Sequence, residues 1–433
     1  MNAIPAVSEC DVLVVGGGPG GSTAATLLRE RGWNVVLIDK DRHPRFHIGE
    51  SLLPYNLPIF DRLGVSDELK AMGVTKRGAD FTIPGSDRYQ LFQFALDTGS
   101  ERRFAYQVRR AEFDHMLLRN AERKQVRVLE GTRARDVTFE DDGRVQVTAE
   151  DDAGNAFAWR ARFLVDASGR DTWLGNRLQT KQRNPKHNHA ALYSHFAGVV
   201  RRPGDEAGNI SIYWIDEGWI WMIPLPDGSM SIGAVCRPKY LQSRVASGLD
   251  PSAFLLATLR RSAAVAARIE GARMIMPAVA TGNYSYSSTR MYGENYVMIG
   301  DAYAFVDPIF SSGVFLAMDH AEQSVDAIDR ILAGKATARQ AFPAVGRRLR
   351  RGINRFSWFI YRFTSPAIQF MFTHPADAFG MRRAVFRLLA GDVFGRNLKT
   401  DFSLLVFRLV YWAASLTFWR ATRAHRRERH ETG

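Results

Sequence analysis

Three glycines near the start of the chain have the spacing of a loop that binds phosphate. Gly16, Gly18 and Gly21 form a G-x-G-x-x-G pattern that follows the apolar run 12–15. Glycine is needed in such a loop because the turn is tight and a pyrophosphate must approach bare backbone at a helix N-terminus. Asp39 lies 18 residues after Gly21, where a carboxylate can accept the hydroxyl groups of a ribose. The pattern predicts a dinucleotide site, and a purely structural glycine turn is the alternative.

The segments around this loop predict the elements that must position it. Residues 12–15 and 35–38 are continuous apolar runs, as expected of strands covered on both faces, and residues 22–31 between them indicate a helix. Such a β-α-β unit implies parallel strands and a doubly wound sheet. Later segments continue the pattern, with a helix expected over 112–123 and strands over 126–129, 145–149, 157–165 and 296–299. The expected fold class is α/β, and α+β when the whole chain is considered.

Between residues 189 and 237 the chain is rich in short aromatic segments with strand character, which predicts an antiparallel sheet and a second domain. A helix is expected over 253–269. The predicted organisation is a nucleotide-binding domain over 1–185 with interleaved substrate-domain segments around 76–110, an inserted antiparallel-sheet substrate domain over 186–280, a return to the first domain over 281–330, and a basic, aromatic-rich helical region over 331–433.

Two distant segments indicate which dinucleotide is bound. Arg110 lies in VRRAEFD, and Asp301 follows an apolar strand and a glycine in GDAYAFVDP. Together with the glycine loop, these segments resemble those of flavoproteins with the p-hydroxybenzoate hydroxylase-type fold. The resemblance implies FAD as the cofactor, with Arg110 at the flavin nucleotide and Asp301 at the ribityl chain. The FAD contacts that it implies are Gly16, Gly18, Gly21, Asp39, Arg110, Asp301 and Gly313.

The segment 218–224, GWIWMIP, resembles the G-W-x-W-x-I-P signature of flavin-dependent halogenases. Trp219 and Trp221 are two residues apart on a predicted strand, so their indoles face the same side and form a broad apolar wall. Such a wall could keep an organic substrate away from the flavin. Ordinary core packing is the alternative for a tryptophan pair in a strand.

Lys76, in GVTKRGADF, lies 26 residues after Glu50 of the GESLLP segment. The halogenase family has its catalytic lysine in a similar place, so the resemblance implies that role for Lys76. An amine can donate a hydrogen bond to hypohalous acid, or be halogenated itself, and burial would lower its pKa. A surface lysine beside Arg77 is the alternative.

The segment 307–313, DPIFSSG, resembles the halide-site loop of the same family. Small residues there leave backbone N–H groups free to bind an anion, and the resemblance assigns the halide to Ser312 and Gly313. Tryptophan halogenases have a glutamate where this chain has Phe310. The resemblance is therefore closer to the branch that acts on phenols or pyrroles, with Phe310 part of the active-site wall.

The histidines do not have the spacing of a metal site, so none is expected. His320 is expected to be a packing residue in a helix that begins near Ala317. His43, His47, His187 and His189 lack companion ligands.

The chain contains one glycine loop of this type, so a dedicated nicotinamide domain is not expected. The first hypothesis is a halogenase that receives FADH2 from a separate flavin reductase, consumes halide as co-substrate, and halogenates a phenol- or pyrrole-type ring that is free or carried on an acidic carrier protein. The second is an FAD-dependent monooxygenase or reductase that acts on an aromatic or polyene-lipid substrate, uses NAD(P)H directly and ignores halide. The third is a degenerate flavoprotein that binds without catalysis.

Charge is concentrated at the C-terminal end of the chain. The net charge is +13, and residues 331–433 contain 19 Lys and Arg against 5 Asp and Glu, a balance of +14 that leaves −1 for the remainder. A basic face far from the chemistry argues against a nucleic-acid enzyme and favours an acidic partner, an anionic membrane surface or a solvated basic face. Residues 403–419 are apolar except for Arg408, and 420–431 are strongly basic. They predict a buried helix that caps the substrate cavity, or alternatively an interfacial helix or a dock for a carrier protein.

The composition, with 46% hydrophobic and 24% charged residues, excludes a disordered chain, a fibrous repeat and a disulfide miniprotein. Cys10 and Cys236 are too few for a disulfide framework, and the first ten residues lack the pattern of a secretory signal. A cytoplasmic location is expected, with association of the C-terminal region with a membrane as an open alternative.

Overall fold

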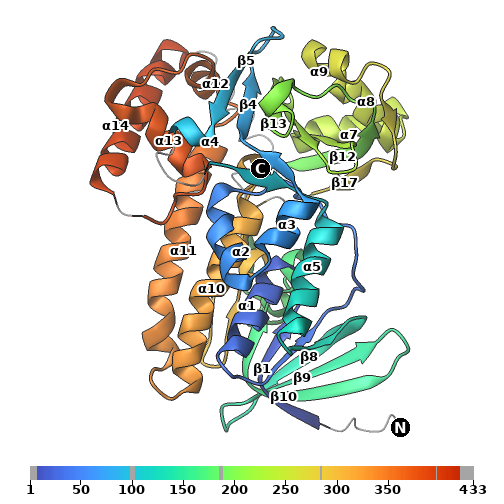
Figure 1. The fold of residues 1–433 in the computed structure, drawn as a ribbon, viewed down its shortest axis with the longest axis vertical. Helices are drawn as coiled ribbons and strands as arrows, with labels where there is room; N and C mark the ends of the chain where they lie inside the picture. The colour runs from blue at the N-terminus through green and yellow to red at the C-terminus, as the bar shows by residue number, and fades with distance from the viewer. Residues whose placement is uncertain (1–6, 98–102, 185–188, 283–284, 396, 420–433) are drawn as a thin grey trace.

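The computed structural model describes residues 7–97, 103–184, 189–282, 285–395 and 397–419 (Figure 1). The basic segment 420–431 and His187, both considered above, lie outside these ranges. The α/β fold class predicted from the sequence is confirmed, with one largely parallel sheet, one antiparallel sheet and a helical C-terminal region.

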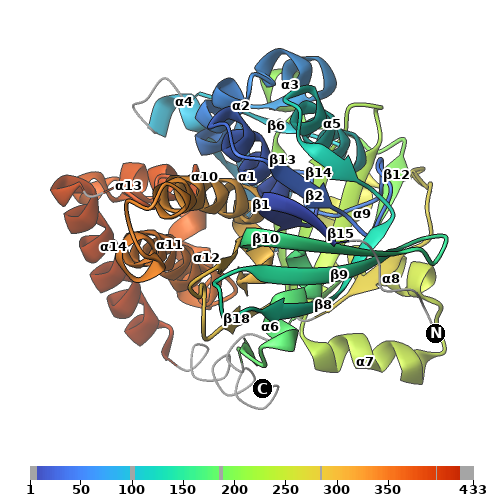
Figure 2. The ribbon, with the colours of Figure 1, turned by 90° about the horizontal axis from the view of Figure 1, so that it is seen from below.

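The first sheet is built on a central parallel core. Strand β1 (Val7–Val15) pairs in parallel with β2 (Val35–Ile38) on one side and with β10 (Ala156–Asp166) on the other. The continuous valine, leucine and isoleucine runs of these strands are buried on both faces, which is typical of parallel sheets. The sheet continues with β7 (Arg127–Leu129), β9 (Val145–Asp151), β8 (Thr132–Phe139) and β19 (Tyr296–Met298). Figure 2 shows β1 and β10 side by side at its centre.

Helices from both ends of the chain cover this sheet. Helix α1 (Pro19–Glu30) follows β1 and packs against α5 (Arg110–Arg123) and α10 (Ser312–Leu332). The shorter α2 (Leu57–Leu63) and α3 (Ser66–Met72) lie beside α5 on the same side of the sheet (Figure 1). Elements from residues 7–72, 110–166 and 296–332 thus form one layered unit whose strand ends meet the glycine loop.

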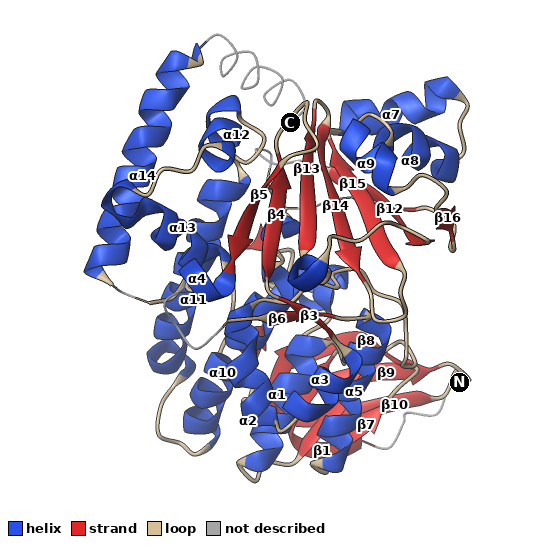
Figure 3. Cartoon of the chain, turned by 45° about the horizontal axis from the view of Figure 1, so that its top comes forward, coloured by secondary structure: helices blue, strands red, loops and turns tan. Residues whose placement is uncertain are grey.

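The second sheet is mostly antiparallel and takes strands from two separate parts of the chain (Figure 3). At one edge, β4 (Gly78–Thr82) pairs with β5 (Tyr89–Gln93), and on its other side β4 runs parallel to β13 (Ile210–Ile215). Across the sheet the strands are β16 (Arg273–Met274), β12 (Ala190–Ala197), β15 (Met230–Cys236), β14 (Gly218–Pro224), β13 (Ile210–Ile215), β4 (Gly78–Thr82) and β5 (Tyr89–Gln93), and β17 (Val279–Thr281) also pairs with β12. Two small sheets complete the description: β3 (Val74–Lys76) with β6 (Ala105–Gln107), and β11 (Lys181–Arg183), β18 (Tyr286–Ser288) and β20 (Ala304–Phe305).

Helices flank the second sheet at its two ends. The expected continuous helix over 253–269 is in fact two, α8 (Pro251–Leu259) and α9 (Ala263–Arg268), because the Ser262 hydroxyl caps a new helix by accepting from the Val265 N–H. The β5 end is covered by the C-terminal helices (Figure 3). The remaining helices are α4 (Phe94–Asp97), α6 (Trp173–Arg177), α7 (Pro238–Ser247), α11 (Ala338–Ile360), α12 (Pro366–Thr373), α13 (Met381–Leu389) and α14 (Leu398–Thr417).

Within the described ranges, none of the helices combines the length and the hydropathy that crossing a bilayer requires.

Candidate active site

The glycine loop joins β1 to α1, and its three glycines serve different purposes. Gly16 has a φ of +108°, and a Cβ atom there would lie 2.3 Å from the Ala167 carbonyl oxygen. A Cβ on Gly21 would lie 1.9 Å from the carbonyl oxygen of Gly16. These two glycines are required by the fold itself. A Cβ on Gly18 would meet only the Arg45 guanidinium, at 3.8 Å, so the fold leaves the backbone at Gly18 open to a ligand.

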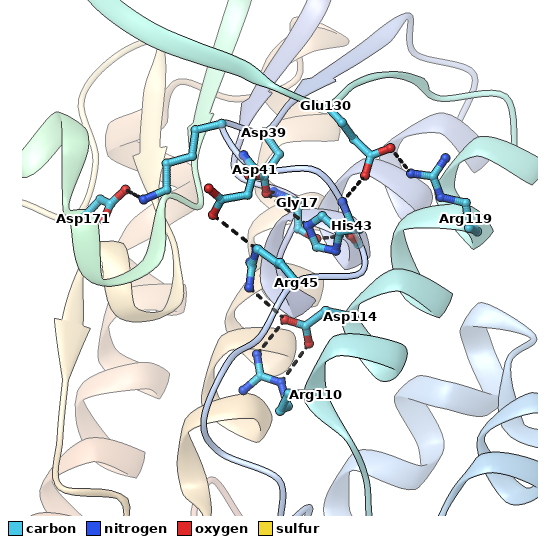
Figure 4. Close-up of polar contacts among 12 residues, drawn as sticks. Gly17, Asp39, Asp41, His43, Arg45, Arg110, Asp114, Arg119, Glu130 and Asp171 are labelled. Atoms are coloured by element: carbon cyan, nitrogen blue, oxygen red, sulfur yellow. Dashed lines mark hydrogen bonds and ion pairs between the residues drawn. The ribbon is translucent and has the colours of Figure 1, made fainter. Parts of the chain in front are cut away.

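Asp39, at the end of β2, is held beside this loop (Figure 4). Its Oδ2 accepts a hydrogen bond of 2.6 Å from the Gly17 N–H, and its Oδ1 accepts one of 2.9 Å from the Asp41 N–H. Burial opposes ionisation of this carboxyl, but the nearby His43 ring, at 3.6 Å, and the hydrogen bonds from the Asp41 and Gly17 N–H groups together lower its pKa. Asp39 is therefore an ionised acceptor at the edge of the cavity described next.

A cavity of about 770 Å³ lies between the glycine loop and the antiparallel sheet, and its size is that of a site for a large organic ligand. We refer to it as the large cavity. The sequence-predicted residues that line it are Gly16, Gly18, Asp39, Arg110, Trp219, Trp221, Asp301 and Gly313. Gly21, Lys76, Phe310 and Ser312 lie outside its lining. The structure thus brings together residues from β1, β2, α5, β14 and the start of α10.

Arg110, at the start of α5, is fixed by charge-assisted hydrogen bonds (Figure 4). Its Nε and Nη2 donate to the two carboxylate oxygens of Asp114 at 2.8 and 2.9 Å, and its Nη1 donates to the Ile48 carbonyl at 3.0 Å. This bidentate pair holds the guanidinium against the large cavity in one orientation.

Asp301 follows β19 and is half-buried in the wall of the same cavity. Burial raises the pKa of its carboxyl to about 6, against partial opposition from Arg170 and Arg110. The cavity thus offers bare N–H groups at Gly18, an acceptor for ribose hydroxyls at Asp39, a fixed cation at Arg110 and a second acceptor at the half-buried Asp301. This donor set fits FAD.

A buried acid–histidine pair also borders the large cavity. Glu50 Oε1 lies 2.6 Å from His195 Nε2, and Glu50 is part of the cavity lining. The other carboxylate oxygen of Glu50 is buried and has no hydrogen-bond partner in the described part of the chain. A buried oxygen left without a partner is costly, so Glu50 is positioned to accept a hydrogen bond from a bound molecule.

Lys76 is at the end of β3, which pairs with β6, and only 2% of its surface is exposed. Its Nζ donates hydrogen bonds to the Ser51 Oγ at 2.9 Å and to the Leu52 carbonyl at 3.0 Å. Burial lowers the pKa of the Lys76 amine to about 7, because the charged form loses its hydration. A substantial fraction of this amine is therefore neutral at neutral pH, and the surface alternative for Lys76 is wrong.

Lys76 faces a second, smaller cavity of about 40 Å³, which we call the Lys76 chamber. Its lining is mostly apolar and consists of Leu53, Lys76, Ala79, Phe81, Phe92, Gln93, Phe94, Ile210, Ile212, Ile309, Phe310, Ser311, Phe386 and Leu389. Ile210 and Ser311 line the large cavity as well, and Ser51, which accepts from Lys76, also borders the large cavity. The two cavities therefore share a wall one residue thick.

The segment 307–313 forms part of that wall. Helix α10 begins at Ser312, five residues earlier than the sequence indicated, and Ser311 precedes it with a left-handed φ of 57°. Gly313 lines the large cavity, while the Ser312 hydroxyl is buried and unpartnered among the described residues. Backbone N–H groups at a helix start attract an anion.

Phe310 faces the Lys76 chamber and makes edge contacts with Phe359 and Phe363, at ring-centroid distances of 6.4 and 5.6 Å. The indole rings of Trp219 and Trp221, 5.8 Å apart, line the large cavity rather than the chamber. Aromatic rings thus border both cavities, but Phe310 and the tryptophans lie on different sides of the shared wall.

His320 lies within α10 and is buried. Its Nδ1 accepts a hydrogen bond of 3.3 Å from the Gly300 N–H, and burial lowers its pKa to about 3, so the ring is neutral. In the ranges that the structure describes, no three or more His, Cys, Asp or Glu side chains are grouped as a metal site would need.

Sequence reasoning missed the residues that lie between the two cavities, namely Ser51, Ile210 and Ser311, and also Leu52, whose carbonyl accepts a hydrogen bond from Lys76. Ser51 and Leu52 belong to the GESLLP segment from which the position of Lys76 was counted. The residues that follow Glu50 in this segment were therefore available as candidates. No sequence pattern indicated Ile210, which reaches the wall through the pairing of β13 with β4.

Comparison with known proteins agrees with this site. A family model described as tryptophan halogenase matches residues 93–367, and one described as FAD dependent oxidoreductase matches residues 11–171. The chain is 29% identical over 415 residues to a 1H-pyrrole-2-carbonyl-[peptidyl-carrier protein] chlorinase of Pseudomonas fluorescens, which covers 90% of this chain and 91% of that one.

Two solved structures show the same architecture. The myxobacterial chondrochloren halogenase, described as a variant of FAD-dependent halogenases, superposes with a TM-score of 0.78 at 32% identity, covering 95% of this chain and 91% of that one. A flavoprotein/dehydrogenase from Cytophaga hutchinsonii superposes with a TM-score of 0.86 at 27% identity, covering 95% and 100%. The tryptophan halogenase model spans more than half of the chain, and the large cavity carries the groups that FAD requires. This chain therefore belongs to the tryptophan halogenase family and is an FAD-dependent oxidoreductase.

Proposed function

We propose that this enzyme oxidises halide with reduced FAD and O2 and transfers the halogen through Lys76 to a phenol- or pyrrole-type ring. The observation that carries the proposal is the position of the Lys76 amine. It is buried, hydrogen-bonded, and faces a small chamber that shares the residues Ile210 and Ser311 with the large cavity. A small oxidised halogen species formed on one side of this wall has a short path to an amine on the other.

Bound in the large cavity, reduced FAD supplies two electrons and halide two more for the reduction of O2, so that the products are hypohalous acid, water and oxidised FAD. The chain's own residues act on the halide and the acid. Gly313 at the start of α10 presents backbone N–H groups to a halide, and the buried Ser312 hydroxyl lies beside it in the chain. We assign the halide to these two residues.

Trp219 and Trp221 form an apolar wall of the large cavity, and Phe310 forms part of the chamber wall. In this proposal these aromatic side chains keep the organic substrate apart from the flavin in the large cavity, so that the organic ring reaches Lys76 but not the flavin. Apolar walls also exclude water, which would otherwise dilute the hypohalous acid.

The hydrogen bonds of Lys76 indicate which form of the amine reacts. A neutral amine has two N–H bonds, and Ser51 and Leu52 accept two hydrogen bonds from this nitrogen. The remaining lone pair is then available to a molecule in the chamber. The lone pair takes the halogen from hypohalous acid with release of water, and the ring then takes the halogen from nitrogen while its proton returns to the amine. Lys76 is regenerated in each cycle.

The chamber favours a neutral, electron-rich ring as acceptor. Its polar side chains are Lys76, Gln93 and Ser311, and the rest of its lining is apolar. Where tryptophan halogenases have a glutamate, the Phe310 ring cannot pair with a charged amino-acid substrate. Similarity over 90% of the chain to a pyrrolyl-carrier-protein chlorinase supports a pyrrole-type ring on an acidic carrier as one candidate acceptor. Because the sequence holds one dinucleotide loop, we assign the supply of reduced FAD to a separate flavin reductase.

The test is Lys76→Met, which removes the amine but keeps the length of the buried side chain. The enzyme is incubated with a flavin reductase, bromide or chloride, and phenol and pyrrole acids, both free and carrier-bound, and products are identified by mass spectrometry. We expect a loss of halogenated product of at least about a hundredfold, the lower end of what a positioned catalytic group supplies. FAD affinity, measured by fluorescence titration, should not change.

Lys181→Met is the matched control, because Lys181 donates to Thr172 and lies outside the Lys76 chamber. This variant should halogenate at the rate of the unmodified enzyme. Normal halogenation by Lys76→Met would contradict the lysine role. A hydroxylated product formed with NAD(P)H in the absence of halide would contradict the halogenase assignment and favour a monooxygenase.

A further inference from the structure

Helix α14 (Leu398–Thr417) has one face packed against the rest of the C-terminal region. Its Phe407 ring contacts Phe359, at a centroid distance of 5.4 Å, and its Tyr411 ring contacts Trp358 at 5.3 Å. The Ser403 hydroxyl donates to the Phe379 carbonyl at 2.8 Å. These contacts, and its packing against α12 and α13, fix the orientation of the helix.

The opposite face of α14 is exposed and almost entirely apolar. Figures 1 and 3 show the helix at the edge of the molecule. Its apolar residues follow one another at alternating steps of four and three, which places them on one side of a helix. They are Leu398, Phe402, Leu405, Leu409, Trp412, Leu416 and, just beyond the helix, Trp419.

The exposure of these side chains is large enough to require an explanation. Leu398 is 88% exposed, Leu409 60% and Leu416 74%. Phe379, 71% exposed, adds its ring at 6.5 Å from that of Phe402. Surface helices normally present polar residues to water, and a contiguous apolar patch of this kind marks an interaction surface.

The sequence of this part of the chain is positively charged. In residues 397–419 the sole acidic residue is Asp401, and its carboxylate is paired with Arg355. Lys399 is exposed beside the first apolar residues. The sequence that follows, 420–433, contains five arginines and two glutamates, and residues 331–433 together carry a balance of +14. The partner of this face is therefore anionic as well as apolar.

From these observations we infer that the exposed face of α14 lies on an anionic lipid surface. An apolar helix face flanked by basic residues buries its side chains at the boundary between headgroups and acyl chains, while the basic residues pair with the headgroups. Trp412 and Trp419 suit this boundary, because an indole has an apolar body and a polar N–H. A second copy of the chain fits less well, since two regions of the same positive charge would face each other.

The position of α14 gives this contact a consequence for the active site. Helix α13 packs against α14 and contributes Phe386 and Leu389 to the lining of the Lys76 chamber. The lipid-facing helix is therefore separated from the chamber by one helix.

Sedimentation with vesicles tests the inference on the full-length protein. The vesicles are phosphatidylcholine alone or a mixture with phosphatidylglycerol. The variant Leu409→Glu/Leu416→Glu places two charges on the exposed face, where no core contact is lost. Val200→Glu/Leu249→Glu is the matched control, because both residues are exposed and follow β12 and α7 in the chain, outside the C-terminal helices.

We expect the unmodified chain and the control to pellet with anionic vesicles and much less with phosphatidylcholine alone. The partition coefficient of the Leu409→Glu/Leu416→Glu variant should fall by more than about tenfold, since two leucine side chains would no longer enter the apolar layer. Equal pelleting of this variant would overturn the inference, because basic charge alone would then account for binding. An unmodified chain that ignores anionic vesicles but self-associates in sedimentation velocity, with the association lost in the variant, would overturn it in favour of a second copy. None of these readouts requires halogenating activity, so they stand apart from the test of Lys76.

Discussion

At the residue scale, the Lys76 amine is shaped by burial and by two hydrogen bonds acting together. Burial lowers its pKa to about 7, while Ser51 and Leu52 orient the N–H bonds. A surface lysine would stay protonated near neutral pH. Its lone pair would then form an N–H bond and could not accept a halogen. In the proposed mechanism, burial is thus what makes the neutral amine accessible at neutral pH.

The pH dependence of halogen transfer follows from this pKa. If the neutral amine accepts the halogen, product formation should increase as pH rises through about 7 and level off above it, because deprotonation frees the lone pair. The measurement is the single-turnover yield of halogenated product with pre-reduced FAD across pH 5.5 to 9, a range of roughly two units on each side of the transition.

Consumption of reduced FAD by O2, followed over the same range, is the control for effects on the flavin. A product yield that falls as pH rises would contradict the neutral-amine route. It would instead support a protonated Lys76 that donates a hydrogen bond to hypohalous acid.

The sequence allowed some of these residues to be predicted and not others. Gly16 and Gly21 are required by close backbone approaches, so their pattern is strict and visible. The role of Lys76 is a prediction from resemblance. Its hydrogen-bond partner Ser51 is 25 residues away, and the contact between them exists only once β3 has paired with β6. Polar contacts made by tertiary packing leave no periodic signal.

At the element scale, helix starts and small strands place the chemistry. Helix α10 begins at Ser312 rather than near Ala317, because Ser311 adopts a left-handed conformation that the apolar pattern does not reveal. Helix α13, which was expected only as part of a helical region, closes one side of the Lys76 chamber with Phe386 and Leu389. The fold class could be read from the strand pattern, whereas this closure could not.

The size of the chamber predicts that α13 controls access to Lys76. A volume of about 40 Å³ holds a few water-sized molecules, each of which needs about 10–15 Å³, so an aromatic ring must displace part of the lining to reach Lys76. Leu389→Ala should open the wall, lowering the KM of bulky phenols severalfold relative to phenol while leaving kcat for phenol nearly unchanged. Michaelis–Menten kinetics over a series of phenols of increasing size would measure this.

Leu388→Ala is the control for this prediction, since Leu388 is a buried neighbour on α13 that lies outside the chamber lining. It should cost about 2 kcal/mol or more in unfolding free energy without changing the size preference. An unchanged size preference in Leu389→Ala would mean that the ring reaches Lys76 by another side.

At the scale of the whole molecule, the large cavity joins two sheets that are assembled from interleaved parts of the chain. Its lining includes Gly18 and Asp39 from the parallel-sheet unit and Trp219 and Trp221 from β14. The pairing of β4 with β13, 131 residues apart at Asp80 and Ser211, brings the early segment into the second sheet. Such long-range pairing is the part of the architecture that local sequence patterns describe least well.

Because FAD would contact both sheets, its binding should stabilise the whole chain against thermal unfolding. A ligand that binds the folded state at 100 times its Kd adds about 2.7 kcal/mol, so the Tm should rise by a few degrees and increase further with FAD concentration. Gly18→Ala should keep the Tm of the ligand-free chain, since its Cβ would meet only Arg45 at 3.8 Å, but should lose most of the FAD-induced increase. Gly346→Ala, in α11, is the control and should keep the full increase, because its new methyl group would approach the ends of Arg350 and Met291, and none of these three residues lines the large cavity. Differential scanning calorimetry measures these Tm values. An equal FAD-induced increase in Gly18→Ala would mean that the pyrophosphate does not approach this backbone. A large drop in the ligand-free Tm of this variant would mean that Gly18 serves the fold rather than the cofactor.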